Sequence, residues 1–244
     1  MGVQPPLKLD HAKEAIMAKL TYHGHSTFTL TTDDGTRIVM DPWFDENPVS
    51  DIKAGDIEAL DYILCTHGHF DHFDDAIPLA QRTGAQLVST FEIVSFVQTR
   101  GVENVHPLHI GGGFTFPFGY VKMTPALHGG QVSGDDEGAF TTVPGGFWMD
   151  LSSTRLYNAG DTALLTDMGL LKGKVDVAIL PIGDNFTMGP EDAVRAIDFI
   201  EPQVVIPVHY NTFDPIKQDP EAFREMVGDR ARVEIMSPGD VYEL

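Results

Sequence analysis

The sequence predicts a mixed α/β domain built in layers. Apolar residues make up 42% and charged residues 21% of the 244-residue chain, an ordinary globular composition with enough apolar residues for a sizeable core. Strand-like and helix-like segments alternate from Ala18 onward. Some of the strand-like segments are joined by short turns and others are separated by helices. This mixture predicts a sheet architecture with substantial antiparallel pairing and covering helices.

The chain is expected to hold one folded domain. We expect residues 18–244 to form that domain and residues 1–17 to be an N-terminal extension or a cloning remnant, because Met17-Ala18-Lys19 resembles a second natural beginning. No apolar run approaches the roughly 18–20 residues that a membrane span needs. The first residues also lack the apolar core of a signal peptide. We therefore expect a cytoplasmic protein without a membrane partner.

The first two strand-like segments are predicted to form a hairpin. Residues 28–32 and 37–40 are predicted strands around the turn Asp33-Asp34-Gly35. Residues 62–65 are fully apolar and predict a short buried strand. Residues 71–82 predict a helix that Pro78 is expected to interrupt. Then follow a strand at 86–90, a helix at 92–99 and a strand at 119–124.

The second half repeats the alternation. Residues 145–151 and 154–158 predict a strand pair, and residues 190–200 predict an amphipathic helix with proline at its first position and acids in its first turn. The remaining predicted elements are strands at 175–181, 204–208 and 232–235 and a helix at 220–227. Residues 129–146 are rich in glycine and acids, so we expect a mobile loop there.

Charge and cysteine content exclude some classes of protein. Acidic residues outnumber basic ones by 36 to 16, a formal net charge of −20, which argues against a broad nucleic-acid-binding surface. A small anionic substrate stays open, because a bound metal can reverse the local field. The single cysteine, Cys65, excludes an internal disulfide and fits a reducing compartment.

The segment Thr66-His67-Gly68-His69-Phe70-Asp71-His72 carries the strongest chemical signal. It directly follows the apolar strand at 62–65. Residues two apart in an extended segment point to the same side, so His67 and His69 can hold one ion together. Asp71 and His72 lie at the start of the following helix and can point at a second ion. Histidine nitrogens and a carboxylate suit a divalent transition metal.

Three more candidate ligands follow predicted strands. His128 comes after the strand at 119–124, Asp161 after the strand at 154–158, and His209 ends the strand at 204–208. Each alone is more often a surface residue or a satisfied core residue. Together with the first motif they complete two half-sites.

This ordered set resembles the metallo-β-lactamase-fold superfamily of metal-dependent hydrolases. The family pattern is H-x-H-x-D-H, then a lone histidine, a Gly-Asp and a last histidine, and its early aspartate matches Asp41. The resemblance runs from about Leu20 to Val241. The segments at 22–26, 183–190 and 207–213 resemble the UPF0173 branch, which is related to the ascorbate-phosphate lactonase-like group.

The resemblance implies an αββα sandwich, with two mixed sheets flanked by helices and the site at one edge between the sheets. It implies a first metal held by His67, His69 and His128. It implies a second metal held by Asp71, His72 and His209. Asp161 would bridge both ions, and Asp41 would accept a hydrogen bond from a ligand histidine and set its tautomer. The single cysteine is not at a ligand position, so we expect Cys65 to pack in the core.

The implied dinuclear site predicts a hydrolase. A water that bridges two ions about 3.5–4 Å apart loses its proton near neutral pH, and the hydroxide attacks a carbonyl or phosphorus centre. Asp71 is expected to orient the nucleophile or to pass a proton to the leaving group. The expected substrate is a small molecule with an ester, lactone or phosphodiester bond. Zinc is the expected metal, although manganese, iron and nickel also accept these ligands.

His25 is the second candidate catalytic residue. It belongs to the Gly-His-Ser segment that the resemblance places beside the site, where it would contact substrate or donate a proton. A backbone-bonded structural role is the competing interpretation, and His23 is expected to be structural. The candidate pocket residues are Asp184, Asn185 and Tyr210, and Trp43 and Phe213 are further candidates for the pocket walls. Phe44 is expected to pack in the core.

Two other functions stay open. One is a phosphodiesterase that acts on a cyclic nucleotide or on nucleic acid. Of these two substrates, the small cyclic nucleotide agrees better with the strongly acidic chain. The other is a non-catalytic metal-binding scaffold, which the complete ligand set disfavours. The exposed edges of the sheets would allow a homo-oligomer.

Overall fold

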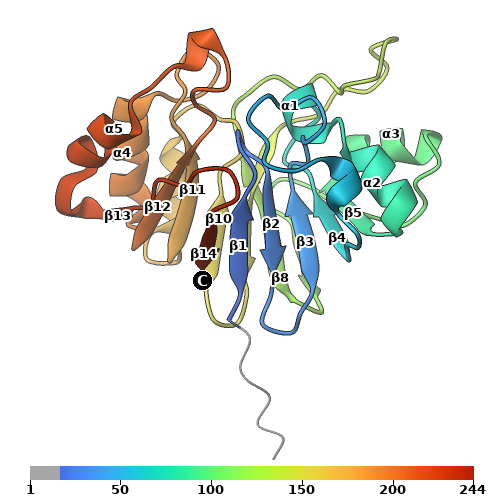
Figure 1. Ribbon diagram of the computed structural model, residues 1–244, viewed down its shortest axis with the longest axis horizontal. Helices are drawn as coiled ribbons and strands as arrows, with labels where there is room; N and C mark the ends of the chain where they lie inside the picture. Colours follow the sequence, from blue (N-terminus) through green and yellow to red (C-terminus); the bar gives the residue numbers. More distant parts are fainter. Residues whose placement is uncertain (1–16) are drawn as a thin grey trace, which may run out of the picture.

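The computed structural model describes residues 17–244. Apart from Met17, the predicted N-terminal extension at residues 1–17 lies outside the described residues. The described strands form two mixed sheets that face each other, and the helices cover the outer faces (Figure 1). The expected αββα sandwich is therefore confirmed. In the described part of the chain, no helix combines the length and the apolar character needed to cross a membrane.

The first sheet has the strand order β14-β1-β2-β3-β4-β5-β6. Its strands are β1 (Lys19–Tyr22), β2 (Phe28–Thr31), β3 (Arg37–Met40), β4 (Tyr62–Leu64), β5 (Gln86–Thr90), β6 (Val105–Leu108) and β14 (Val241–Glu243). The strands from β14 to β3 pair antiparallel, and those from β3 to β6 pair parallel. The predicted hairpin of β2 and β3 is present, with Leu30 opposite Ile38.

The second sheet has the order β13-β12-β11-β10-β9-β8-β7. Its strands are β7 (Gly113–Phe116), β8 (Gly119–Pro125), β9 (Gly145–Asp150), β10 (Arg155–Asn158), β11 (Val177–Pro181), β12 (Val204–Val208) and β13 (Arg232–Val233). The strands from β7 to β10 pair antiparallel, and those from β10 to β13 pair parallel. Both sheets therefore combine the two kinds of pairing.

Helices cover each sheet from outside (Figure 1). The first sheet is covered by α1 (Phe70–Phe73), α2 (Ala76–Thr83) and α3 (Phe91–Thr99), and the second by α4 (Pro190–Ile200) and α5 (Pro220–Val227). Short 3₁₀ turns occur at η1 (Ala54–Asp56), η2 (Thr166–Leu171), η3 (Asp214–Ile216) and η4 (Gly228–Arg230). The parallel strands β4 and β11 are apolar on both faces because a helix layer covers one and the opposite sheet the other.

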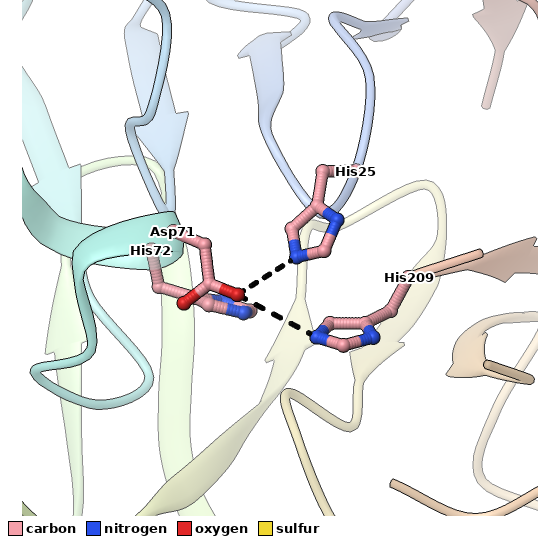
Figure 2. Close-up of side chains that lie close together, drawn as sticks. All are labelled: His25, Asp71, His72 and His209. Atoms are coloured by element: carbon pink, nitrogen blue, oxygen red, sulfur yellow. Dashed lines mark hydrogen bonds and ion pairs between the residues drawn. The ribbon is translucent and has the colours of Figure 1, made fainter. Parts of the chain in front are cut away.

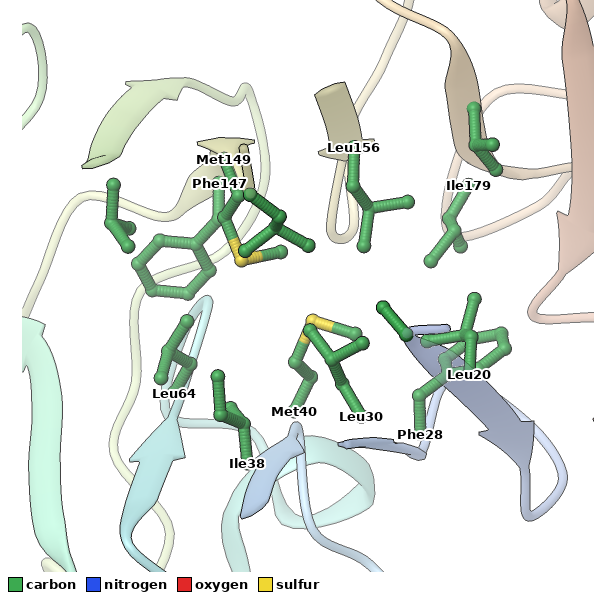
Figure 3. Close-up of a cluster of buried hydrophobic side chains, with 14 of the residues drawn as sticks. Leu20, Phe28, Leu30, Ile38, Met40, Leu64, Phe147, Met149, Leu156 and Ile179 are labelled. Atoms are coloured by element: carbon green, nitrogen blue, oxygen red, sulfur yellow. The ribbon is translucent and has the colours of Figure 1, made fainter. Parts of the chain in front are cut away.

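The main core lies between the two sheets. Alternate residues of each strand point inward, so Leu30 and Met40 of the first sheet face the same cluster as Phe147 and Leu156 of the second (Figure 3). These four side chains are fully buried. Cys65 packs in a second apolar cluster beneath α2 and α3, as expected. This double packing holds the strand ends, and hence the loops after them, in place.

The predicted helix at 71–82 is corrected in one respect. The break lies at Asp74–Asp75, between α1 and α2, and not at Pro78. Pro78 is the third residue of α2, in the first turn, where a missing N–H costs no helical hydrogen bond. The Asp75 carboxylate accepts hydrogen bonds from the backbone N–H groups of Phe44 (2.5 Å) and Asp45 (3.1 Å), which ties the break to the loop after β3.

Other boundaries also differ from the predictions. The last predicted strand, 232–235, shortens to β13, while β1, β6, β7 and β14 were not predicted as strands. The predicted loop at 129–146 is irregular up to Gly145, where β9 begins. It is anchored by Val132, which is fully buried, and by the N–H of Ser133, which donates to the carbonyl of Gly68 at 2.6 Å.

Candidate metal centre

The candidate ligands lie where strands of both sheets end. Asp41 directly follows β3, and Asp161 and His209 follow β10 and β12. His67 lies between β4 and α1, and α1 itself lies at the upper edge of the sandwich in Figure 1. Because the two sheets face each other, loops from both converge at this edge. Residues far apart in the sequence are thereby brought together.

Three histidines form the first group. His67, His69 and His128 each offer a ring nitrogen, and these atoms lie within 4.8 Å of one another. Nδ1 of His69 lies 3.1 Å from Nε2 of His128. His67 is fully buried, while His69 and His128 are partly exposed. One face of this group is therefore open to a ligand.

The second group contains His25, Asp71, His72 and His209, whose side chains converge in Figure 2. Oδ2 of Asp71 lies 3.1 Å from Nε2 of His25 and 3.7 Å from Nε2 of His209. The rings of His25 and His209 have centroids 4.1 Å apart. All four residues are buried. The resemblance had left His25 outside the ligand sets, so its position in this group is new.

Asp161 lies between the two groups. Its Oδ2 is 3.5 Å from Nε2 of His128 and 3.0 Å from Nε2 of His209, and its Oδ1 is 3.2 Å from Nε2 of His72. The carboxylate thus contacts histidines of both groups at once. This is the position that a residue bridging two ions needs.

The residues present fit a metal centre. Nε2 of His67 and Nε2 of His72 are buried and have no hydrogen-bond partner. Buried polar atoms are rarely left without a partner, so two such nitrogens facing the same carboxylate indicate that a ligand completes them. Imidazole nitrogens and carboxylate oxygens, without a thiolate, suit zinc, manganese, iron or nickel.

Two residues outside the groups orient these histidines. Asp41 Oδ2 accepts a hydrogen bond from Nδ1 of His72 at 3.0 Å, and the Thr66 hydroxyl donates to the same oxygen at 2.8 Å. The Thr66 hydroxyl in turn lies 3.0 Å from Nδ1 of His67. Both histidines therefore turn Nε2 toward the centre. The predicted role of Asp41 agrees with this geometry, whereas the role of Thr66 was not predicted.

The backbone is strained at the same edge. His25, Asp41 and His209 have φ values of 58°, 48° and 56°, in the left-handed region that residues other than glycine rarely adopt. Such outliers persist only where the surrounding structure enforces them, and they cluster at functional sites. Here they aim side chains into the site from the ends of strands.

The electrostatic environment favours neutral histidines in the first group and an ionised Asp161 carboxylate. Burial, together with the neighbouring His72, holds the pKa of His67 well below its usual value. Burial would raise the pKa of Asp161, but His209 and His72 outweigh it and leave this pKa well below its usual value. Burial and the nearby His209 lower the pKa of His25 to about 4, although Asp71 opposes them.

A cavity of about 560 Å³ opens above the two groups. It is lined by His69, Phe70, Asp71, His128, Gln131, Asp161, Phe186, His209, Phe213 and Pro215. Phe70, Gln131, Phe186 and Pro215 were not among the predicted pocket residues. Phe70 lies inside the metal motif, so its position in the sequence was a usable signal.

The predicted pocket residues are placed differently. Asp184, Asn185 and Tyr210 do not line this cavity in the described structure. Tyr210 instead packs against the apolar cluster that includes α4. Asp184 and Asn185 form a turn with positive φ that presents the adjacent Phe186. Phe44 is fully buried, and His23 bonds to Asp51 and Thr29, which agrees with the structural roles expected for both.

Comparisons with known proteins decide the family. The model of the Beta-lactamase superfamily domain matches residues 36–210. A UPF0173 metal-dependent hydrolase of Shouchella clausii is 47% identical over 209 residues, which cover 84% of this chain and 91% of that protein. The chain belongs to the UPF0173 family of the β-lactamase superfamily. A UPF0173 metal-dependent hydrolase of Anoxybacillus flavithermus, 45% identical over 88% of this chain and 96% of its own length, agrees.

A solved structure extends this family relationship to the fold. A metallo hydrolase of the hyperthermophilic archaeon Ignicoccus hospitalis matches with a TM-score of 0.83 and 35% identity, over 93% of this chain and 99% of its own. The UPF0173 membership confirms the resemblance inferred from the motifs and identifies the chain as a metal-dependent hydrolase. None of these relationships states a substrate.

Proposed function

We propose that this UPF0173 protein hydrolyses an ester, lactone or phosphodiester bond of a small molecule with two divalent metal ions, most readily zinc. The observation that carries the proposal is the Asp161 carboxylate, which lies within 3.5 Å of His128, His209 and His72 and so joins the two groups of ligands. We further propose that the protein works in the cytoplasm, without a membrane or nucleic-acid partner, and that a homo-oligomer is compatible with its sheet edges.

The ligand assignment follows the two groups. His67, His69 and His128 would hold the first ion, and Asp71, His72 and His209 the second, with Asp161 between them. When bound, two such ions would supply Lewis acidity and lower the pKa of a bound water. His25 shares the second group but bonds to Asp71 and Thr212, so we assign it to positioning Asp71.

The chain's own groups can handle the protons of the reaction. Asp71 lines the cavity, and its Oδ2 is held by His25. A carboxylate held there can take a proton from the attacking water and pass it to the leaving group. The Thr212 hydroxyl lies 2.9 Å from Nδ1 of His25, which leaves Nε2 of His25 to donate to Asp71.

Metal analysis tests the proposal. The protein purified without added metal is analysed for its elements, stripped with a chelator, reloaded and assayed on esters, lactones and phosphodiesters. We expect close to two ions per chain and activity that returns with the metal. Asp161→Asn should lower both, whereas the exposed Asp229→Asn should change neither. One ion per wild-type chain would contradict the bridging role of Asp161. If the protein contains no metal and hydrolyses none of the substrates, the hydrolase proposal fails and a non-catalytic scaffold is the remaining interpretation.

A further inference from the structure

We infer that the part of the substrate outside the reacting bond is neutral and apolar, preferably aromatic, and that Phe70, Phe186 and Phe213 recognise it. This inference rests on the proposed hydrolytic function and narrows its substrates to neutral esters or lactones with an apolar group. The three phenylalanines line the cavity above the metal ligands.

Two of the three wall residues are exposed to solvent. The Phe70 side chain is 48% exposed and that of Phe186 is 54% exposed, although both belong to a cavity wall. Exposed apolar side chains that gather at one cavity mark a binding surface more often than scattered ones do. A ligand with an apolar ring would cover them and gain the free energy of removing both surfaces from water.

Buried aromatic residues support this wall from behind. The ring of Trp43, only 2% exposed, has its centroid 5.7 Å from that of Phe70 and 5.8 Å from that of Phe213. The ring of His25 lies 5.6 Å from Phe213. Phe70 and Phe213 are therefore held in position before any ligand arrives, which lowers the entropic cost of binding.

The charges around the cavity disfavour an anionic group. In the part of the chain that the structure describes, neither lysine nor arginine lines the cavity, and the polar side chain that lines it besides the candidate metal ligands is the amide of Gln131. In the chain, acidic Asp184 lies two residues before Phe186, and acidic Asp214 directly follows Phe213. Lys217, close in sequence, is paired with Asp214 at 2.8 Å. A phosphate or carboxylate that lies against the phenylalanines, away from the metal ligands, would find no lysine or arginine to pair with.

Matched esters test the inference on the metal-loaded protein. 4-Nitrophenyl butyrate and 4-nitrophenyl hemisuccinate share a leaving group and a similar acyl length, but the second carries a carboxylate. We expect kcat/KM to be at least about tenfold higher for the butyrate, as expected when a pocket leaves a charge unpaired. Equal or faster turnover of the hemisuccinate would overturn the inference.

Variants assign the effect to the wall. Phe186→Ala should lower kcat/KM about tenfold for methyl phenylacetate but less than about twofold for methyl acetate, which has no apolar group large enough to reach the wall. Phe91→Ala is the matched control, since Phe91 is 59% exposed and does not line the cavity. An equal loss on both esters in Phe186→Ala would show a structural role and contradict the inference.

A binding measurement separates this inference from the proposed function. In Trp148→Phe, Trp43 is the one remaining tryptophan, and its contact with Phe70 and Phe213 makes it a fluorescent reporter of the wall. We expect a saturable change with phenylacetamide and at least about tenfold weaker binding of acetamide. If no ester, lactone or phosphodiester is hydrolysed but phenylacetamide binds in this way, the proposed function fails and the apolar specificity stands. No saturable change with phenylacetamide overturns the inference.

Discussion

Asp41 and His72 form a buried pair in which Nδ1 of His72 donates to Oδ2 of Asp41 at 3.0 Å. Both side chains are fully buried. Oδ1 of Asp41 accepts from the backbone N–H of Thr66 at 2.7 Å, so the carboxylate is locked to the strand end that carries the metal motif. The pair fixes the tautomer of His72 and turns its unpartnered Nε2 toward Asp161.

Asp41→Asn should weaken metal binding. An amide NH₂ group in the place of Oδ2 would face Nδ1 of His72, which already carries a proton, so two donors would oppose each other. Loss of such an orienting partner typically lowers metal affinity about 10–100-fold. Competition with a chromogenic chelator measures the affinity, with exposed Asp229→Asn as control. Zinc affinity within twofold of wild type in Asp41→Asn would show that the pair does not orient a ligand.

His25→Ala should lower kcat while the metal content stays unchanged, because we assign His25 to positioning Asp71 and not to holding an ion. Removing a group that serves general acid–base catalysis lowers rates by about 10²–10⁴-fold. Thr212→Val, which deletes the hydroxyl 2.9 Å from Nδ1 of His25, should lower kcat less, and Thr212→Ser should restore it. The metal content of His25→Ala is measured by elemental analysis together with the kinetics. Loss of an ion in this variant would show that His25 is a metal ligand and would contradict the assignment.

Gly68→Ala should destabilise the protein. A Cβ atom at Gly68 would lie 2.9 Å from Cα of Val132, a backbone atom, so the chain there would have to shift to admit it. Overpacking of this kind costs about 1–3 kcal/mol. Gly55→Ala is the matched control, since a Cβ there meets no atom within 4 Å. Urea unfolding gives the free energies, and equal values for the two variants would refute the close approach of the 129–146 loop to the motif.

Asp176→Asn should remove a pH-dependent part of the stability. Hydrogen bonds from Arg155, at 2.8 Å and 3.0 Å, hold the pKa of Asp176 below its usual value. A carboxylate with a lowered folded-state pKa stabilises the fold above its unfolded pKa of about 3.9, and this contribution is lost as the pH falls through the folded pKa.

Unfolding titrations of wild type and Asp176→Asn at pH 7 and at successively lower pH test this sign. The wild-type advantage should be largest at pH 7 and shrink below about pH 4, as far down as the wild type stays folded. Exposed Asp229→Asn should follow the wild type throughout. An advantage that grows as the pH falls would contradict the assignment.

The motif-bearing elements were predictable from local sequence. The apolar strand before His67 is present as expected, because a continuous apolar run fits a strand buried on both faces. The helix at 190–200 is also present, because its amphipathic pattern fits a helix buried on one face. The strands β1, β6, β7 and β14 escaped prediction. They are short, and several of their residues are partly exposed, so their pairing depends on partners distant in the chain.

The sequence by itself determined which residue types carry the chemistry and in which order, because a short motif such as His67 to His72 acts through neighbours in the chain. Tertiary structure alone decided three other features: His25 beside Asp71, Thr66 between Asp41 and His67, and the grouping of Phe70 and Phe186 with Phe213 in one wall. The physical reason is the same in each. These contacts join loops at the edge of two facing sheets, and their distances depend on how the core between the sheets packs.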